Sequence, residues 1–276
     1  MEKECNHDCE NCEEVCDEKE TGIQKLEPNE SSSIKKVIGI VSGKGGVGKS
    51  FVTAIIASHL ADEGFKVGII DADITGPSIP KLFGIKKKAS ESPMGIIPQR
   101  SYKGIDIMSI NLLIPDESDP VVWRGPLLSG AVSQFFTDVV WKDIDYLLVD
   151  MPPGTADVSL TVFQSLPIDG IVVVTSPQDL VSLIVGKSIK MAEKLSVPVL
   201  GIVENMSYYV CPECKHHHYP FGLSKLDDIC KKFQIDTSVR LPINKDYATA
   251  SDLGKIEFLQ IQEIDPLIKK IDLLLL

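Results

Sequence analysis

One glycine-rich octapeptide constrains the fold of this chain more than any other segment: Gly43-Lys44-Gly45-Gly46-Val47-Gly48-Lys49-Ser50. The apolar run 37–41 before it predicts a buried strand, and residues 52–60 after it predict a helix. In that setting the glycines let backbone N–H groups point at phosphate oxygens, and the helix N-terminus adds positive potential. We therefore expect a phosphate-binding loop in which Lys49 reaches the β- and γ-phosphates and the Ser50 hydroxyl binds Mg²⁺. The alternative is a surface glycine turn with two solvated lysines.

Beyond this loop, short apolar runs alternate with segments of helical periodicity. The apolar runs predict strands near residues 37–42, 67–71, 105–110, 145–150, 170–175, 198–204 and 238–241. The helical patterns lie near residues 49–64, 125–140, 179–195, 222–234 and 256–274. Continuously apolar strands are typical of a parallel sheet that is covered on both faces. The alternation thus predicts an α/β fold, a doubly wound and mostly parallel sheet that binds ligands at the carboxyl ends of its strands.

The negative charge of the chain is concentrated near its N-terminus. The formal net charge is −11, and residues 1–20 hold nine acids and two lysines, which is −7 of that total. Residues 1–33 are expected to form a flexible, acidic, Cys-rich tail and linker, and residues 34–276 a single P-loop ATPase domain. No concentrated basic face suggests a nucleic-acid partner, and no apolar run reaches the roughly 18 residues of a membrane span. We expect a cytoplasmic protein without a membrane partner.

Acidic residues end two of the predicted strands. Asp71 closes the run 67–71 and Asp73 follows it, while Asp150 closes the run 145–150. Mg²⁺ beside a phosphate loop is held by one or two carboxylates together with phosphate oxygens and water. We expect Asp150 to serve the metal, and one of Asp71 and Asp73 to support it while the other orients the attacking water. Each aspartate could instead be a helix N-cap or a turn residue.

Several segments together resemble one family of proteins. They are residues 43–50, 71–78, 122–126, 150–157 and 204–207, the last followed by Cys211-Pro212-Glu213-Cys214. In this order they are similar to the Mrp-type (ApbC-like) P-loop ATPases, which are iron–sulfur cluster carriers of the deviant Walker A, MinD-related group. The likeness extends over about residues 36–255.

The resemblance implies an ATPase that hydrolyses ATP slowly and only as a dimer. It implies a carrier or scaffold that holds a 4Fe–4S cluster at a homodimer interface and delivers it to apo iron–sulfur proteins. Lys44 would reach the partner's nucleotide and stabilise phosphate charge, with Lys49 and Asp73 completing the catalytic set. Asp73 would orient water, Asp71 and Asp150 would serve Mg²⁺, and Asn205 would contact adenine.

The resemblance also assigns a switch and shows two departures. Residues 152–154, Pro-Pro-Gly, would sense the γ-phosphate. Phe51, within the nucleotide-binding set, stands where many relatives have Thr, and this removes a hydroxyl contact to the α-phosphate. Ala156 stands where many relatives have Gly, which stiffens the switch.

Cys211 and Cys214 offer two thiolates, which are too few for a closed tetrahedral metal site. The resemblance implies that two copies of the pair bind one bridging 4Fe–4S cluster. Alternatively, the pair and two residues of the run His216-His217-His218 could form a zinc site within one chain, or the loop could hold no metal. Cys230, on a predicted helix, is expected to be a buried core thiol.

Four further cysteines lie in the tail: Cys5, Cys9, Cys12 and Cys16. Spacings of four, three and four residues would place them on one face of a helix. Four thiolates suffice for a second 4Fe–4S cluster or for zinc, although the tail could also be unliganded.

Three other functions compete with the carrier. A MinD/ParA-like positioning ATPase would use a basic amphipathic C-terminal helix, but residues 261–276 carry two lysines against three acids. That segment is better interpreted as a helix packed on the core. The other possibilities are an ATPase switch with a zinc-stapled loop, and a non-catalytic metal or electron carrier whose nucleotide site has decayed.

Overall fold

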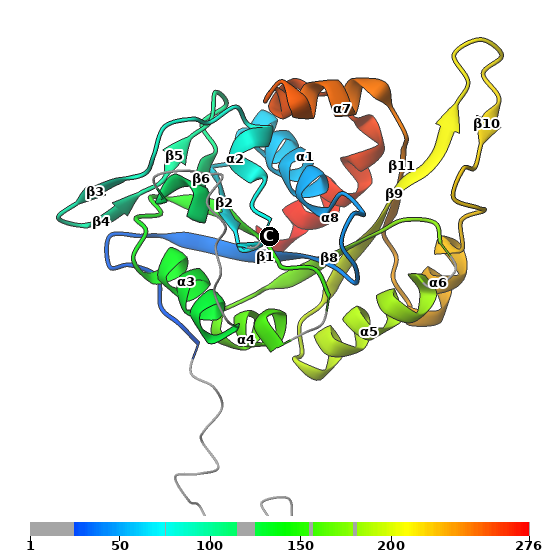
Figure 1. Cartoon of the computed structure of the whole chain (residues 1–276). Coiled ribbons are helices and arrows are strands. Elements are labelled where there is room, and N and C mark those ends of the chain that lie inside the picture. Colours follow the sequence, from blue (N-terminus) through cyan, green and yellow to red (C-terminus); the bar gives the residue numbers. More distant parts are fainter. Residues whose placement is uncertain (1–24, 75, 115–124, 155–156, 179–180, 276) are drawn as a thin grey trace, which may run out of the picture.

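The computed structural model describes residues 25–74, 76–114, 125–154, 157–178 and 181–275 (Figure 1). The strands are β1 (Ile34–Ser42), β2 (Val67–Asp71), β3 (Ser90–Ser92), β4 (Gly95–Ile97), β5 (Gln99–Arg100), β6 (Asp106–Ser109), β7 (Ile144–Asp150), β8 (Gly170–Thr175), β9 (Val199–Val210), β10 (His217–His218) and β11 (Ser238–Pro242). The α-helices are α1 (Lys49–Asp62), α2 (Ile79–Leu82), α3 (Gly125–Thr137), α4 (Asp157–Ser165), α5 (Val181–Lys194), α6 (Leu226–Phe233), α7 (Lys245–Asp252) and α8 (Asp265–Asp272). Short 3₁₀ turns lie at Ile110–Leu112, Ile256–Phe258, Gln262–Ile264 and Leu273–Leu275.

A central sheet organises the described residues. Its strand order is β10-β9-β8-β1-β7-β2-β6-β5, with β11 also paired to β9. The pairs among β1, β2, β6, β7, β8, β9 and β11 are parallel, whereas β5 and β10 are antiparallel to their neighbours. The seven strands expected from the sequence are all present, and the predicted doubly wound α/β fold is confirmed.

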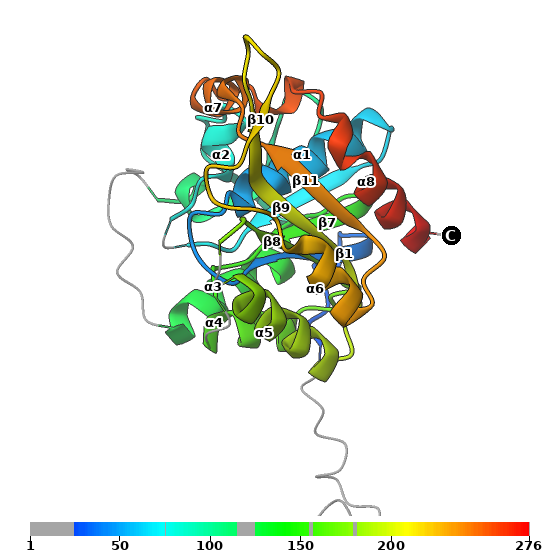
Figure 2. The same cartoon turned by 90° about the vertical axis from the view of Figure 1, so that its right-hand side faces the viewer.

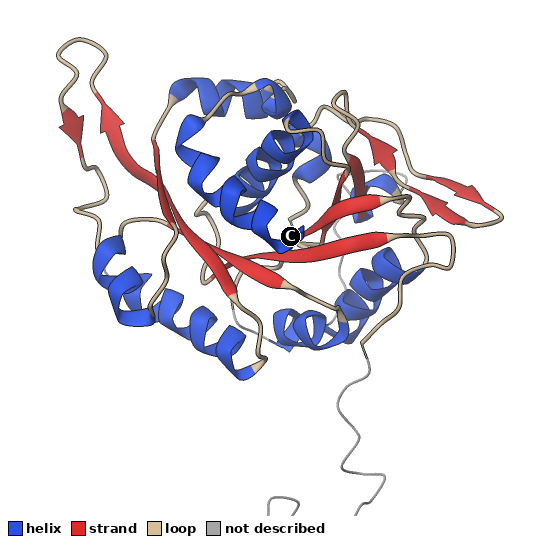
Figure 3. Ribbon diagram, turned by 180° about the vertical axis from the view of Figure 1, so that it is seen from behind, coloured by secondary structure: helices blue, strands red, loops and turns tan. Residues whose placement is uncertain are grey.

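Helices cover both faces of the sheet, as Figures 1 and 3 show. One hydrophobic core lies between the sheet and α1, α2 and α8, and the other lies beneath α3, α4, α5 and α6. Strand residues alternate between the two cores; Ile38 and Ile40 face α1, whereas Val37 and Val41 face the opposite layer. Burial on both faces explains why these strands are continuously apolar in the sequence.

The strand order brings the acidic strand ends next to the glycine loop. β7 lies between β1 and β2, and Asp150 is the register partner of both Ile40 on β1 and Asp71 on β2. The loop that leaves β1 therefore lies next to the carboxyl end of β7, with the carboxyl end of β2 one strand further along the sheet. This is the edge at which open α/β sheets bind ligands.

One predicted helix was wrong in its extent. Residues 256–274 were expected to form one helix, but two 3₁₀ turns and an extended residue, Leu259, precede α8. Pro266 lies in the first turn of α8, where its missing N–H costs no hydrogen bond, and it cannot continue a helix from the residues before it. α8 buries Leu267, Ile268 and Ile271, so the expected packing of this segment on the core is confirmed. Within the described residues, no helix combines the length and apolar character needed to cross a bilayer.

Residues 25–33, expected in a flexible linker, lie along the body of the protein. The Lys25 ammonium donates to the carbonyl oxygens of Phe163 and Leu166 at 2.8 and 2.9 Å. The backbone N–H of Ser33 donates to the Trp141 carbonyl at 2.9 Å. This part of the predicted linker is thus attached to the domain.

Candidate nucleotide-binding site

The glycine loop forms a cavity at the carboxyl end of β1. Gly46 and Gly48 both adopt φ of 81°, a left-handed conformation that favours glycine, and Gly48 is the N-cap of α1. The cavity has a volume of about 270 Å³. It is lined by Ser42, Lys44, Gly45, Gly46, Val47, Gly48, Lys49, Ser50, Phe51, Asp73, Ser78, Leu82 and Pro153. The sequence-predicted phosphate loop is therefore assembled as a concave backbone surface at a helix N-terminus, which suits an anion.

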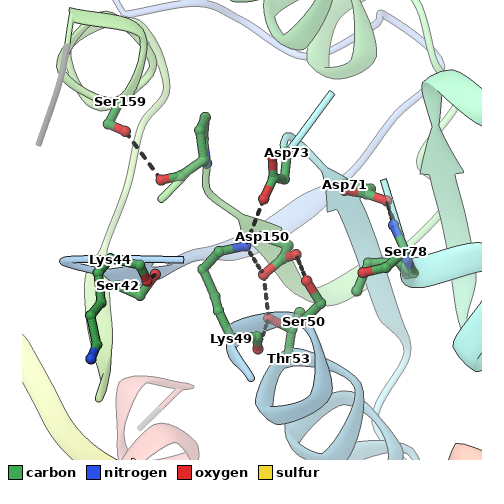
Figure 4. A network of polar contacts seen from close by, with 12 residues as sticks. Ser42, Lys44, Lys49, Ser50, Thr53, Asp71, Asp73, Ser78, Asp150 and Ser159 are labelled. Atoms are coloured by element: carbon green, nitrogen blue, oxygen red, sulfur yellow. Dashed lines mark hydrogen bonds and ion pairs between the residues drawn. The ribbon is translucent and has the colours of Figure 1, made fainter. Parts of the chain in front are cut away.

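Asp150 is the centre of a buried polar cluster that includes Lys49 and Ser50 from the cavity wall (Figure 4). The Lys49 ammonium lies 2.8 Å from Asp150 Oδ1 and 3.9 Å from Asp73 Oδ2. The Ser50 hydroxyl donates to Asp150 Oδ2 at 2.6 Å, and the Thr53 hydroxyl donates to Asp150 Oδ1 at 2.8 Å. Ser50 and Asp150 thus bring together the hard oxygen donors that Mg²⁺ prefers, beside the loop that would bind phosphates. Thr53 was missed by the sequence reasoning, although its position one helical turn after Lys49 was the available signal.

Asp71 and Asp73 have different surroundings. Asp71 is fully buried, and its Oδ2 accepts the backbone N–H groups of Ser78 and Ile79 at 3.2 Å and the Ser109 hydroxyl at 3.1 Å. The pKa of Asp71 is raised to about 8, mainly by burial and to a smaller degree by repulsion from the nearby carboxylate of Asp150. Asp73 lies in the wall of the cavity instead. The contacts of Asp71 fix the loop that precedes α2, and its expected service to Mg²⁺ stays a prediction.

Lys44 points away from the buried cluster. Figure 4 shows its side chain directed away from Lys49, and its ammonium donates to Gln178 Oε1. The residue nevertheless lines the cavity. The two lysines of the octapeptide therefore face different surroundings, with Lys49 against the acidic cluster and Lys44 at the rim.

A second, largely apolar pocket of about 330 Å³ adjoins the phosphate cavity. Its walls are Gly48, Phe51, Asn205, Met206, Phe221, Pro242, Ile243, Asn244, Tyr247, Ala248 and Ser251. The rings of Phe51 and Tyr247 are 5.4 Å apart, and burial raises the pKa of Tyr247 to about 12, so its phenol stays neutral. The Asn205 amide donates to the Val47 carbonyl at 3.0 Å, which attaches the end of the sheet to the glycine loop. Aromatic walls and one amide at the end of a phosphate cavity suit a flat nucleotide base.

The predicted switch residues follow β7. Pro153 lines the cavity, the Pro152 carbonyl accepts the Ser159 hydroxyl at 3.2 Å, and the Gly154 N–H donates to the Ser42 carbonyl at 2.7 Å. This last bond joins the segment to the end of β1. Ala156 lies outside the described residues.

Cys211 and Cys214 lie at the tip of the hairpin formed by β9 and β10, which reaches beyond the helices in Figures 1 and 2. The Cys211 N–H donates to the His216 carbonyl at 2.9 Å, and the Lys215 N–H donates to the Cys211 carbonyl at 3.0 Å. The backbone N–H of Cys214, and after it that of Glu213, donate to the Cys211 sulfur and lower the pKa of this thiol. The loop thus favours a thiolate, the form that binds soft metals.

The histidines beside this pair are engaged with aromatic residues. The His217 ring stacks on Tyr208 with centroids 4.9 Å apart, and His218 lies 6.4 Å from Tyr209. The part of the chain that the structure describes holds no group of three or more His, Cys, Asp and Glu side chains that could bind a metal. Zinc binding by the pair and these histidines stays a prediction.

The remaining cysteines fall into two groups. Cys230 on α6 is half-buried against the core and not fully buried as expected, and burial raises the pKa of its thiol. Cys5, Cys9, Cys12 and Cys16 lie outside the described residues.

The glycine loop, the buried lysine–aspartate cluster and the doubly wound sheet define a P-loop NTPase. A family model described as ParA, NUBPL iron-transfer P-loop NTPase, matches residues 33–272. The chain belongs to this family, and the resemblance seen in its sequence is confirmed.

Relatives of known name and structure are similar over most of the chain. An iron-sulfur cluster carrier protein from Methanocaldococcus jannaschii is 46% identical over 259 residues, which cover 91% of this chain and 89% of that protein. One from Clostridium perfringens is 46% identical over 82% of each chain. A nucleotide-binding protein from Archaeoglobus fulgidus, solved with ADP, is 43% identical with a TM-score of 0.76, covering 84% of this chain and 91% of its own. The cell division ATPase MinD from Pyrococcus furiosus shares the fold, with a TM-score of 0.63 at 17% identity over 87% of this chain and 99% of its own.

Proposed function

We propose that this protein binds and hydrolyses ATP and carries an iron–sulfur cluster that it delivers to apoproteins. The single observation that carries the proposal is that one β-hairpin, rising from the wall of the nucleotide site, ends in the pair Cys211 and Cys214. The names of the relatives support it, because both carriers are similar over more than four fifths of this chain. A positioning ATPase would have no use for such a pair of thiols.

The nucleotide chemistry follows from the charges around the phosphate cavity. When bound, Mg²⁺ would be held by the Ser50 hydroxyl and the Asp150 carboxylate, and it would neutralise phosphate charge. Lys49 would leave its ion pair with Asp150 to contact the β- and γ-phosphates. Asp73, which faces the same cavity, would orient the attacking water. Asn205 would contact the base from the adjoining pocket.

Hydrolysis is proposed to depend on a homodimer, because Lys44 faces away from the acidic cluster of its own chain. From the rim it would reach the nucleotide of the partner and stabilise charge on the transferred phosphoryl group. Mixing Lys44→Ala with Asp73→Asn protein tests this arrangement. A mixed dimer then has one intact site, so the mixture regains up to about one quarter of wild-type turnover if dimers form at random. If Lys44 served its own chain, neither the pure variants nor the mixture would hydrolyse ATP.

The cluster itself is proposed to bridge two chains, since Cys211 and Cys214 supply only half of the four thiolates that a 4Fe–4S cluster takes. Anaerobic reconstitution with iron and sulfide, followed by iron counting, tests this. The Cys211→Ala/Cys214→Ala protein should contain about four fewer irons per dimer than wild type, and Cys230→Ala should match wild type. Iron bound by the tail cysteines is the same in all three proteins and cancels. Equal iron in every variant, with one zinc per chain at the pair, would favour the zinc-stapled switch instead.

A further inference from the structure

The base pocket and the Cys pair share one hairpin. We propose that Phe221 transmits occupancy of the base pocket to the loop of Cys211 and Cys214, so that a bound base changes the accessibility of these thiols. The inference rests on the proposed nucleotide site and adds to it a route from the base to the thiols within one chain.

The hairpin is built to move as one unit. His217 pairs with Val210, and His218 with Tyr209, across the two strands. The stacking of His217 on Tyr208 joins the strands a second time, nearer the sheet. The tip is closed by the hydrogen bonds between Cys211 and its neighbours described above. A displacement at the foot of the hairpin would therefore be carried to the thiols.

The foot of the hairpin is part of the base pocket. Met206, in the pocket wall, has a φ of 58°, which is unfavourable for a residue with a side chain. The pairing of β9 with β11 shifts register here, between Arg240 and Pro242. The Ile243 N–H, also in the pocket wall, donates to the Tyr208 carbonyl at 2.6 Å. Strain and irregular pairing at this position mark a pivot between the sheet and the hairpin.

Phe221 joins the returning arm of the hairpin to the same pocket. It lies seven residues after Cys214, in a turn closed by the Gly222 N–H donating to the Tyr219 carbonyl at 3.0 Å. Its ring lines the pocket together with Tyr247 although the residue is 43% exposed. A half-exposed aromatic ring gains its main partner when a flat base fills the pocket. The base would then fix the returning arm, while Met206 and Ile243 fix the other end.

Cys211 is half-buried and provides the readout, because its sulfur would react faster with an alkylating agent if the loop opened. A hairpin held at both arms opens less often, so a bound nucleotide slows alkylation of Cys211. Phe221 acts here as a positioning residue, and its removal should uncouple the thiol from the nucleotide while leaving the phosphate cavity intact.

The experiment uses the full-length, iron-free protein without oxygen. Alkylation of each cysteine by iodoacetamide is followed by peptide mass spectrometry, with and without saturating ADP. In wild type, ADP should slow the alkylation of Cys211 and leave the alkylation rate of Cys230 unchanged. In Phe221→Ala, ADP should bind roughly 5- to 20-fold more weakly, as expected for the loss of a stacking face. Saturating ADP should no longer slow the alkylation of Cys211 in this variant. Phe221→Tyr should restore both properties.

Leu223→Ala is the matched control, because Leu223 is 74% exposed on the same segment and does not line the pocket. It should behave as wild type, with circular dichroism confirming that all variants are folded. The inference is overturned if ADP slows the alkylation of Cys211 equally in wild type and in Phe221→Ala. It is also overturned if wild type binds ADP and the alkylation rate of Cys211 does not change. Wild type that binds no ADP overturns the proposed function itself.

Discussion

The ion pair between Lys49 and Asp150 allows a quantitative test of how the phosphate site is stabilised in the nucleotide-free protein. Asp150 is fully buried, Lys49 is 6% exposed, and their charged atoms lie 2.8 Å apart. Asp150→Asn keeps the shape of the side chain but leaves the ammonium in the interior without its main counter-charge. Loss of one partner of a buried pair costs about 3–5 kcal/mol. Because Asp73 lies 3.9 Å away and retains part of the attraction, we expect a loss of about 3 kcal/mol.

Thermal unfolding of the nucleotide-free protein is the assay. A domain of this size loses about 2–4 °C of melting temperature per kcal/mol, so Asp150→Asn should melt about 6–12 °C below wild type. Asp143→Asn is the control, because Asp143 forms an exposed ion pair with Lys66 at 3.4 Å. Exposed pairs contribute about 0–1 kcal/mol.

A double substitution isolates the cause. If the uncompensated ammonium produces the loss, Lys49→Met in the Asp150→Asn protein should recover most of the stability, because it removes the buried charge. Additive destabilisation by the two changes would refute the reasoning. So would a melting temperature for Asp150→Asn equal to that of the Asp143→Asn control.

Three further predictions concern single residues. Gly48→Ala should lower the melting temperature and weaken ADP binding, because a Cβ there would collide with Asn205 Nδ2 and φ is 81°. Burial lowers the pKa of His59, whose Nε2 accepts the Ile261 N–H at 3.3 Å, so the stability contributed by the neutral ring is present above pH 6.5 and lost as pH falls. Urea unfolding at pH 7.5 and 5.5 should show this loss in wild type and a smaller one in His59→Gln. Glu257→Gln should cost about 1–3 kcal/mol in urea unfolding, since the buried carboxylate accepts three hydrogen bonds.

Each of these has its own contrary result. Gly45 has open space around its Cα, so Gly45→Ala should leave the melting temperature nearly unchanged, and an equal loss in both glycine variants would contradict the steric argument. If the stability of His59→Gln falls between pH 7.5 and 5.5 as steeply as that of wild type, groups other than His59 cause the pH dependence. A Glu257→Gln protein as stable as wild type would show that the neutral amide replaces the carboxylate at the turn of residues 101–103.

The parallel strands could be predicted because burial on both faces imposes an unmistakable apolar run. Short polar helices carry no such pattern, and α7, which has no buried residue, was missed. Its Asn244 N-cap, which accepts the Asp246 N–H at 2.8 Å, was a local signal that would have located it. Strand β10 consists of two exposed histidines and forms only through its pairing with β9, so hydrophobic periodicity could not reveal it.

The phosphate cavity could be predicted because its residues lie in one contiguous motif and at two strand ends. The base pocket could not, since Phe51, Tyr247 and Phe221 come from three elements that only the tertiary fold brings together. Asn205 was expected on resemblance alone. What the sequence could not show is that its amide bonds the backbone of the glycine loop, a contact that requires the absence of a side chain at Gly48.

The length of β9 links the two chemistries of this protein. A parallel α/β sheet binds ligands beyond the carboxyl ends of its strands, so a strand that continues past that edge extends on the side of the sheet that holds the ligand. β9 was expected to end near residue 204 but continues to Val210, and the Cys pair follows at once. The thiols therefore lie on the side of the sheet where the nucleotide would bind. Under the proposed function, two chains that meet through this side would bring their nucleotides and their Cys pairs to one interface, and ATP hydrolysis there would act on the contacts that hold a shared cluster.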